Sequence, residues 1–79
     1  MKVREKPKAI KYIKSRHLVK PYLKAKKYIE LGLYEMVDLK KRRPYKLNKF
    51  YFRINHQFRA FGYISDSNEL IVTDISDHQ

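Results

Sequence analysis

The residues best suited to chemistry are two arginines, Arg53 and Arg59, on either side of the tight-turn sequence Asn55-His56-Gln57. A hairpin centred on His56 places these arginines directly opposite each other on adjacent strands. Like charges at opposed positions destabilise a sheet. Because a guanidinium is planar and pairs well with phosphate, the pattern indicates an anion held between the two side chains.

The two faces of this hairpin differ in composition. The face expected to lie under helices is apolar and consists of Phe50, Phe52, Ile54, Phe58, Ala60 and Ile64. The arginine face also carries aromatic rings, from Tyr51, Phe61 and Tyr63. Aromatic rings beside arginines suit the stacked bases of single-stranded nucleic acid. The alternative interpretation is a hydrophobic patch that binds a partner protein or a second copy.

A four-residue turn at 65–68 would place Arg59 opposite Asp74, and an ion pair is the structural alternative to an anion site. The same register predicts that one set of side chains in the last strand faces the helices, namely Ile71, Thr73 and Ile75. It assigns the other set to the arginine side, namely Val72, Asp74, Ser76 and His78. Histidine titrates near neutrality, so His78 is a candidate general acid or base.

Net charge points to the class of ligand. Lys and Arg number 19 against 8 Asp and Glu, which gives a net charge of +11. Such a chain attracts polyanions, and nucleic acid is the expected partner. The alternative is that the charge serves only to keep the protein soluble. The run Lys40-Lys41-Arg42-Arg43-Pro44 is interpreted as a basic loop, either a solvated turn or one that an anion neutralises.

The 79 residues correspond to a single domain over 1–79. The sequence offers little support for other classes of protein, such as secreted, membrane or metal-binding proteins. The absence of cysteine is compatible with a reducing cytoplasm. No apolar run is long enough to span a membrane, and no secretory signal opens the chain. Metal ligands and a Gly-rich phosphate loop are not expected. His17, on a helix stripe, is interpreted as structural, and His56 as exposed.

Periodicity predicts an α+β protein with two N-terminal helices packed on one face of a small, mainly antiparallel twisted sheet. Pro21 suits the first turn of the second helix, and Gly32 suits its C-terminal cap. The helices are expected at 8–17 and 19–31. The strands are expected at 2–5, 34–40, 50–55, 58–64 and 70–76.

The segment 52–63 resembles the core hairpin of RelE/ParE-superfamily toxins. There an arginine, a short turn, an aromatic residue and a second arginine follow one another. The ending at 74–79 is similar to the HigB and YoeB branches, which finish with a histidine just after the last strand. The β-α-α-β-β-β order also matches, and the resemblance is specific from about Leu39 onward.

This resemblance implies a RelE-like fold and the cytoplasmic toxin of a type II toxin–antitoxin pair. Many such toxins are metal-independent endoribonucleases that cut mRNA on the ribosome. The ribose 2′-OH attacks the neighbouring phosphate and leaves a cyclic phosphate and a 5′-OH end. The implied partners are mRNA, the ribosome and a cognate acidic antitoxin, with no membrane and no cofactor.

Residue roles follow from the same resemblance. Arg53 and Arg59 would bind the scissile phosphate and stabilise its developing charge, and His78 would be the general acid or base. RNA-binding roles would go to Lys40, Lys41, Arg42, Arg43, Tyr51, Phe61 and Gln79. Where some branches carry a glutamate base this chain has Val37. Its neighbour Asp38 would point to the opposite face of a strand, so the base is unassigned.

Two other functions remain open at this stage. One is a ParE-like toxin that inhibits DNA gyrase by binding, and the other is a non-catalytic RNA- or DNA-binding module. The expected clustering of Arg53, Arg59 and His78 on one face favours the nuclease. For a binding module, substituting Arg59 would weaken binding in a salt-dependent way and change no chemistry.

Overall fold

Two helices, α1 (Pro7–Ser15) and α2 (Val19–Glu30), make up most of the N-terminal half in a computed structural model that describes residues 1–77. Pro7 occupies the first helical turn, where its missing N–H costs little. Each helix buries one stripe of side chains, which is Ala9 and Ile13 in α1 and Tyr22, Ala25 and Ile29 in α2. Neither helix is long and apolar enough to cross a membrane, a statement that applies to residues 1–77.

A Schellman motif ends α2. Gly32 has a φ of +80°, which glycine adopts without strain. Its N–H donates to the Ile29 carbonyl, and the Leu33 N–H donates to the Tyr28 carbonyl. The prediction that Gly32 caps this helix is therefore confirmed.

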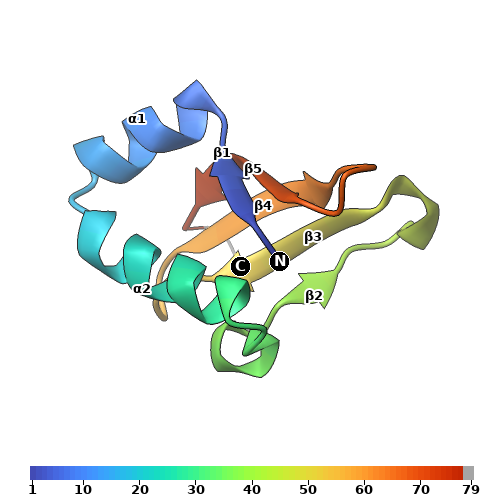
Figure 1. Cartoon of the computed structure of the whole chain (residues 1–79). Helices are drawn as coiled ribbons and strands as arrows, with labels where there is room; N and C mark the ends of the chain where they lie inside the picture. The colour runs from blue at the N-terminus through green and yellow to red at the C-terminus, as the bar shows by residue number, and fades with distance from the viewer. Residues whose placement is uncertain (78–79) are drawn as a thin grey trace.

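The five-stranded sheet has the order β1-β5-β4-β3-β2. Its strands are β1 (Val3–Glu5), β2 (Lys40–Lys41), β3 (Lys49–Arg53), β4 (Arg59–Ile64) and β5 (Leu70–Ser76). The edge strand β1 runs parallel to β5, and the other three pairs are antiparallel. Both helices lie to one side of the sheet (Figure 1). The α+β class with helices on one face is confirmed, with a mixed sheet.

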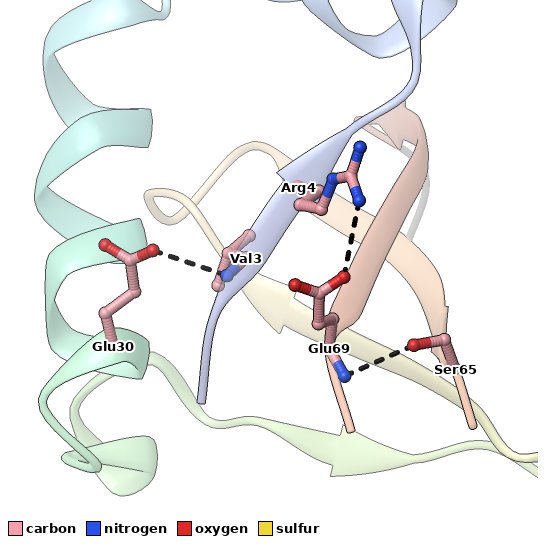
Figure 2. Close-up of polar contacts among 5 residues, drawn as sticks. All are labelled: Val3, Arg4, Glu30, Ser65 and Glu69. Carbon is pink, nitrogen blue, oxygen red and sulfur yellow. Dashed lines mark hydrogen bonds and ion pairs between the residues drawn. The ribbon is translucent and has the colours of Figure 1, made fainter. Parts of the chain in front are cut away.

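Side-chain contacts on both sides link the short strand β1 to the rest of the protein (Figure 2). On the helix side, the Glu30 carboxylate accepts the Val3 N–H at 3.3 Å. On the other side, Arg4 pairs with Glu69 at 3.5 Å, and the Ser65 hydroxyl accepts the Glu69 N–H at 3.3 Å. Glu30 thus accepts a backbone N–H of the sheet's edge strand, and Arg4 links this strand to the residue before β5.

The core lies between the helices and the sheet. Phe52 and Ala60 from the hairpin are 1% and 0% exposed, as the predicted apolar face requires. The remaining buried members come from both layers and include Val3, Ile13, Leu18, Tyr22, Ile29, Val37, Ile54, Leu70, Val72 and Ile75. Hydrophobic burial of this face leaves the opposite face of β2, β3 and β4 free for polar side chains.

The prediction of a strand at 34–40 is wrong. Residues Tyr34–Val37 form a 3-10 helix, and only Lys40–Lys41 pair with a neighbouring strand. The segment satisfies its backbone groups locally, since the Asp38 N–H donates to the Glu35 carbonyl and the Leu39 N–H to the Tyr34 carbonyl. A second 3-10 helix, Tyr45–Leu47, follows the basic loop that was expected at 40–44.

The register of β5 against β4 also differs from the prediction. The turn between them is one residue longer than expected, because Ile64 pairs with Leu70. Leu70 and Val72 therefore join the core, whereas Ile71 takes the opposite side. A β-bulge then places Phe61 opposite Asp74 and leaves Thr73 as the extra residue, which restores Ile75 to the core.

This bulge depends on Gly62. An ideal Cβ at Gly62 would lie 2.0 Å from the Ile71 carbonyl oxygen, so no other residue fits without a backbone shift.

The first helix is shorter than predicted and ends at Ser15. His17 has a left-handed φ of 57° in the turn between the helices and is exposed, so the structural role assigned to it is wrong. His56 is exposed as predicted.

Candidate functional site

The hairpin β3–β4 places Arg53 directly opposite Arg59, as predicted. The side chain of Asn55 closes the turn between them. Its Oδ1 accepts the N–H of Gln57 at 2.9 Å and that of Phe58 at 2.8 Å. The two arginines therefore project from the paired ends of adjacent strands rather than from mobile loops.

Asp38 supplies a carboxylate that sequence reasoning did not place here. Its Oδ2 lies 2.9 Å from Nη2 of Arg53. Asp38 follows the 3-10 helix in a left-handed conformation with φ 51° and ψ 47°, which aspartate tolerates better than most residues. In a regular strand this side chain would have pointed away from the arginines. The left-handed conformation of Asp38 interrupts that alternation. The available sequence signal was an acid two residues before a basic run.

Strand β2 brings Lys40 to the same place, because Lys40 pairs with Tyr51 of β3. A small pocket of about 50 Å³ results. We call it the arginine pocket, and it is lined by Asp38, Lys40, Tyr51, Arg53 and Arg59. A volume of this size suits water or a small group such as a phosphate oxygen. Three cationic side chains surround it against one carboxylate.

A stack of rings and guanidinium groups extends from the arginine pocket. Tyr51 and Phe61 stack with ring centroids 5.9 Å apart and an interplanar angle of 28°. The Arg59 guanidinium carbon lies 5.8 Å from the Tyr51 centroid, and that of Arg42 lies 5.1 Å from the Phe61 centroid. Such cation–π contacts restrict the arginine side chains while leaving their N–H groups available for an anion.

Not every residue predicted to bind RNA shares this face. Lys41 pairs with Phe50 and lies 5.8 Å from its ring centroid, on the helix side of the sheet. Arg43 lies 5.9 Å from the Tyr45 centroid in the loop and does not line the arginine pocket. His78 and Gln79, the remaining predicted site residues, lie outside the described residues.

The expected ion pair between Arg59 and Asp74 does not form. The longer turn and the bulge place Ser76 opposite Arg59, and Asp74 instead pairs with Lys8 at 2.9 Å. Hydrogen bonds from Lys8 and then Thr73 lower the pKa of the Asp74 carboxyl below its usual value. Within residues 1–77, Arg59 therefore has no acidic partner.

The arrangement suits binding and stabilising a phosphoryl group. Two opposed guanidinium groups and an ammonium group supply donors, and one carboxylate can accept a proton or orient a donor. Over the described part of the chain, no three acidic or histidine side chains gather closely enough to hold a metal ion.

No protein-family model matches this sequence, and no curated protein matches it. The fold and the site define a class: a small, basic α+β protein whose mixed sheet presents an arginine pocket beside a stacked aromatic pair.

Proposed function

We propose that this protein is a toxin of the RelE/ParE superfamily that cleaves mRNA on the ribosome. One observation carries the proposal: three cationic side chains and a carboxylate converge on the arginine pocket, next to a stacked aromatic pair. Opposed arginines cost a sheet stability, so their presence at adjacent strand ends favours a role in binding an anion.

The proposed reaction is attack of a ribose 2′-OH on the adjacent phosphorus. A bond forms between the 2′-oxygen and phosphorus, the bond from phosphorus to the 5′-oxygen breaks, and a cyclic phosphate and a 5′-OH end result. Negative charge develops on the non-bridging oxygens. Arg53 and Arg59 are placed to donate hydrogen bonds to those oxygens, and such interactions stabilise the transition state.

Two proton transfers must accompany this attack. Asp38 is the carboxylate of the arginine pocket and is the proposed acceptor of the 2′-OH proton. Its ion pair with Arg53 fixes the carboxylate relative to the phosphate-binding guanidinium. His78 is then the proposed general acid that protonates the leaving 5′-oxygen, and Lys40 assists by neutralising charge.

The aromatic pair provides a surface for bases beside the reacting phosphate. Tyr51 and Phe61 stack on each other, and Arg42 packs against Phe61. Stacking on such rings holds single-stranded RNA with little dependence on sequence. In this proposal the lysines of α1 and α2 contact ribosomal RNA, and an acidic antitoxin neutralises the net charge of +11 in the cytoplasm.

The test is controlled expression in bacteria of the parent chain, Arg59→Gln and Arg16→Gln, with new 5′ ends of cellular mRNA mapped during growth arrest. Arg16 is a matched control, because its guanidinium carbon also packs on a tyrosine, 5.2 Å from the Tyr12 centroid. We expect cuts within translated codons for the parent and for Arg16→Gln, and none for Arg59→Gln.

Growth arrest with intact mRNA would refute the nuclease proposal and favour a gyrase-inhibiting toxin of the same fold. Absence of arrest, together with salt-dependent RNA binding that Arg59→Gln weakens, would instead support a non-catalytic RNA-binding module.

A further inference from the structure

A second pocket adjoins the arginine pocket on the helix side. Its volume is about 420 Å³, and we call it the α2 pocket. Its lining includes Pro21, Lys24, Tyr28, Met36, Arg53 and Asn55. Ligand sites for small molecules commonly enclose roughly 300–1,000 Å³. The turn between β3 and β4 lies beside α2 (Figure 1). The lining residues come from α2, the 3-10 helix, and the end of β3 with the turn that follows it.

Both pockets share one wall. Arg53 lines the arginine pocket and the α2 pocket. The end of the 3-10 helix separates them, because Val37 lines the α2 pocket and the next residue, Asp38, lines the arginine pocket. A ligand that occupies both pockets would therefore contact Arg53 in each.

The lining of the α2 pocket fits a flat ring with polar edges next to a negative charge. Pro21 and Met36 supply apolar surface, and Met36 is 54% exposed. Lys24 and Arg53 supply positive charge, and none of the described residues that line the pocket is acidic. Asn55 uses its Oδ1 within the turn, and within residues 1–77 its Nδ2 has no hydrogen-bond partner.

We propose that the α2 pocket binds a nucleobase of single-stranded RNA, from the nucleotide adjacent to the phosphate held in the arginine pocket. This inference rests on the proposed function, since the same strand occupies both pockets. The base packs against Pro21 and Met36, the amide of Asn55 hydrogen-bonds its edge, and Lys24 contacts its phosphate. Continuity through Arg53 and the positive charge favour RNA over an apolar ligand.

Methionine-methyl NMR provides a direct test, because the chain has two methionines, Met1 and Met36. Only Met36 lines the α2 pocket, so Met1 is the internal control. The probe is a hexanucleotide of 2′-O-methyl RNA, which lacks the attacking hydroxyl and stays intact. We expect the Met36 methyl signal to shift and the Met1 signal to stay. Inorganic phosphate should leave both unchanged.

A paired binding measurement uses Lys24→Gln and Lys20→Gln, two exposed lysines of α2 of which only Lys24 lines the pocket. For Lys24→Gln we expect the slope of log affinity against log salt to flatten by about 0.7, the value for one lost phosphate contact with single-stranded nucleic acid. Lys20→Gln should retain the parent slope for the hexanucleotide, because the ribosomal RNA that the helix lysines are proposed to contact is absent from this measurement.

Several results would overturn the inference. If the RNA shifts amide signals of Arg53 and Arg59 but not the Met36 methyl, no base enters the α2 pocket, although the proposed function survives. If hexaglutamate and not RNA shifts Met36, the pocket binds acidic peptide. If the RNA shifts no signal at all, the inference fails, and the mapping of mRNA 5′ ends decides the proposed function separately.

Discussion

Asp38 Oδ2 lies 2.9 Å from Arg53 Nη2, so the carboxylate nearest the two opposed arginines comes from outside the hairpin that carries them. Asp38 follows a 3-10 helix, and Arg53 ends a strand. Their contact assembles the arginine pocket from three separate segments of chain.

Replacing Asp38 separates proton transfer from positioning. The variant Asp38→Asn keeps an oxygen acceptor for Arg53 but has no carboxylate to take a proton, whereas Asp38→Ala removes both. If Asp38 is the general base, kcat on programmed ribosomes should fall about 10²–10⁴-fold in both variants. A retained kcat in Asp38→Asn with a loss in Asp38→Ala would reduce Asp38 to a positioning residue.

Replacing Arg59 should separate function from stability. Arg59→Gln removes repulsion from Arg53, worth about 0.2–1 kcal/mol, and also a cation–π contact with Tyr51, worth about 0.5–1 kcal/mol. Because these terms oppose each other, we expect the free energy of unfolding in urea to change by less than about 1 kcal/mol. Cleavage should nevertheless fall about 10²–10³-fold. Loss of folding in this variant would contradict the assignment.

Gly62 should be among the least replaceable positions in the sheet. A Cβ there would meet the Ile71 carbonyl oxygen and carbon at 2.0 and 2.9 Å, so Gly62→Ala should destabilise the fold by about 3 kcal/mol or more in urea unfolding, the upper end of overpacking costs. Gly32→Ala is the control. Its Cβ would meet no described atom within 4 Å, and it should cost only about 1–2 kcal/mol for its left-handed backbone. Equal costs would rule out the close approach at the bulge.

Tyr22 should resist ionisation in the folded protein. Burial first, and then the hydrogen bond that its hydroxyl donates to Glu5 at 2.7 Å, raise the pKa of Tyr22 above its usual value. A raised folded-state pKa means that this stabilisation is complete below the unfolded value of about 10 and is lost as the pH rises above it. Lys26 pairs with the same Glu5 oxygen at 2.9 Å.

The measurement for Tyr22 is an ultraviolet titration of tyrosinate. Of the seven tyrosines, Tyr22 should ionise only as the protein unfolds. Tyr22→Phe should lose about 1.5–3 kcal/mol of stability near neutral pH, and its difference from the parent should narrow at alkaline pH. If the difference in unfolding free energy between the parent and Tyr22→Phe stays the same above a pH of about 10, ionisation of Tyr22 does not affect stability.

Local patterns in the sequence determined the two helices, the hairpin and the opposition of Arg53 and Arg59. These features depend on contacts between residues close in the chain: helical periodicity, strand alternation, and the Asn55 side chain closing a tight turn. Gly32 was predictable for the same reason, because a helix end needs a residue that accepts a positive φ.

Only the tertiary structure decided how the remaining segments meet the hairpin. The register of β5 depends on a long turn and on a bulge that Gly62 permits. The pattern of apolar residues along the sequence does not reveal either feature. Residues 34–37 do not pair with a neighbouring strand and form a 3-10 helix instead. This conformation places the Asp38 carboxylate next to Arg53. Pairing between distant segments is set by the packing of the whole sheet. The basic hairpin could therefore be predicted from the sequence, whereas the carboxylate beside it could not.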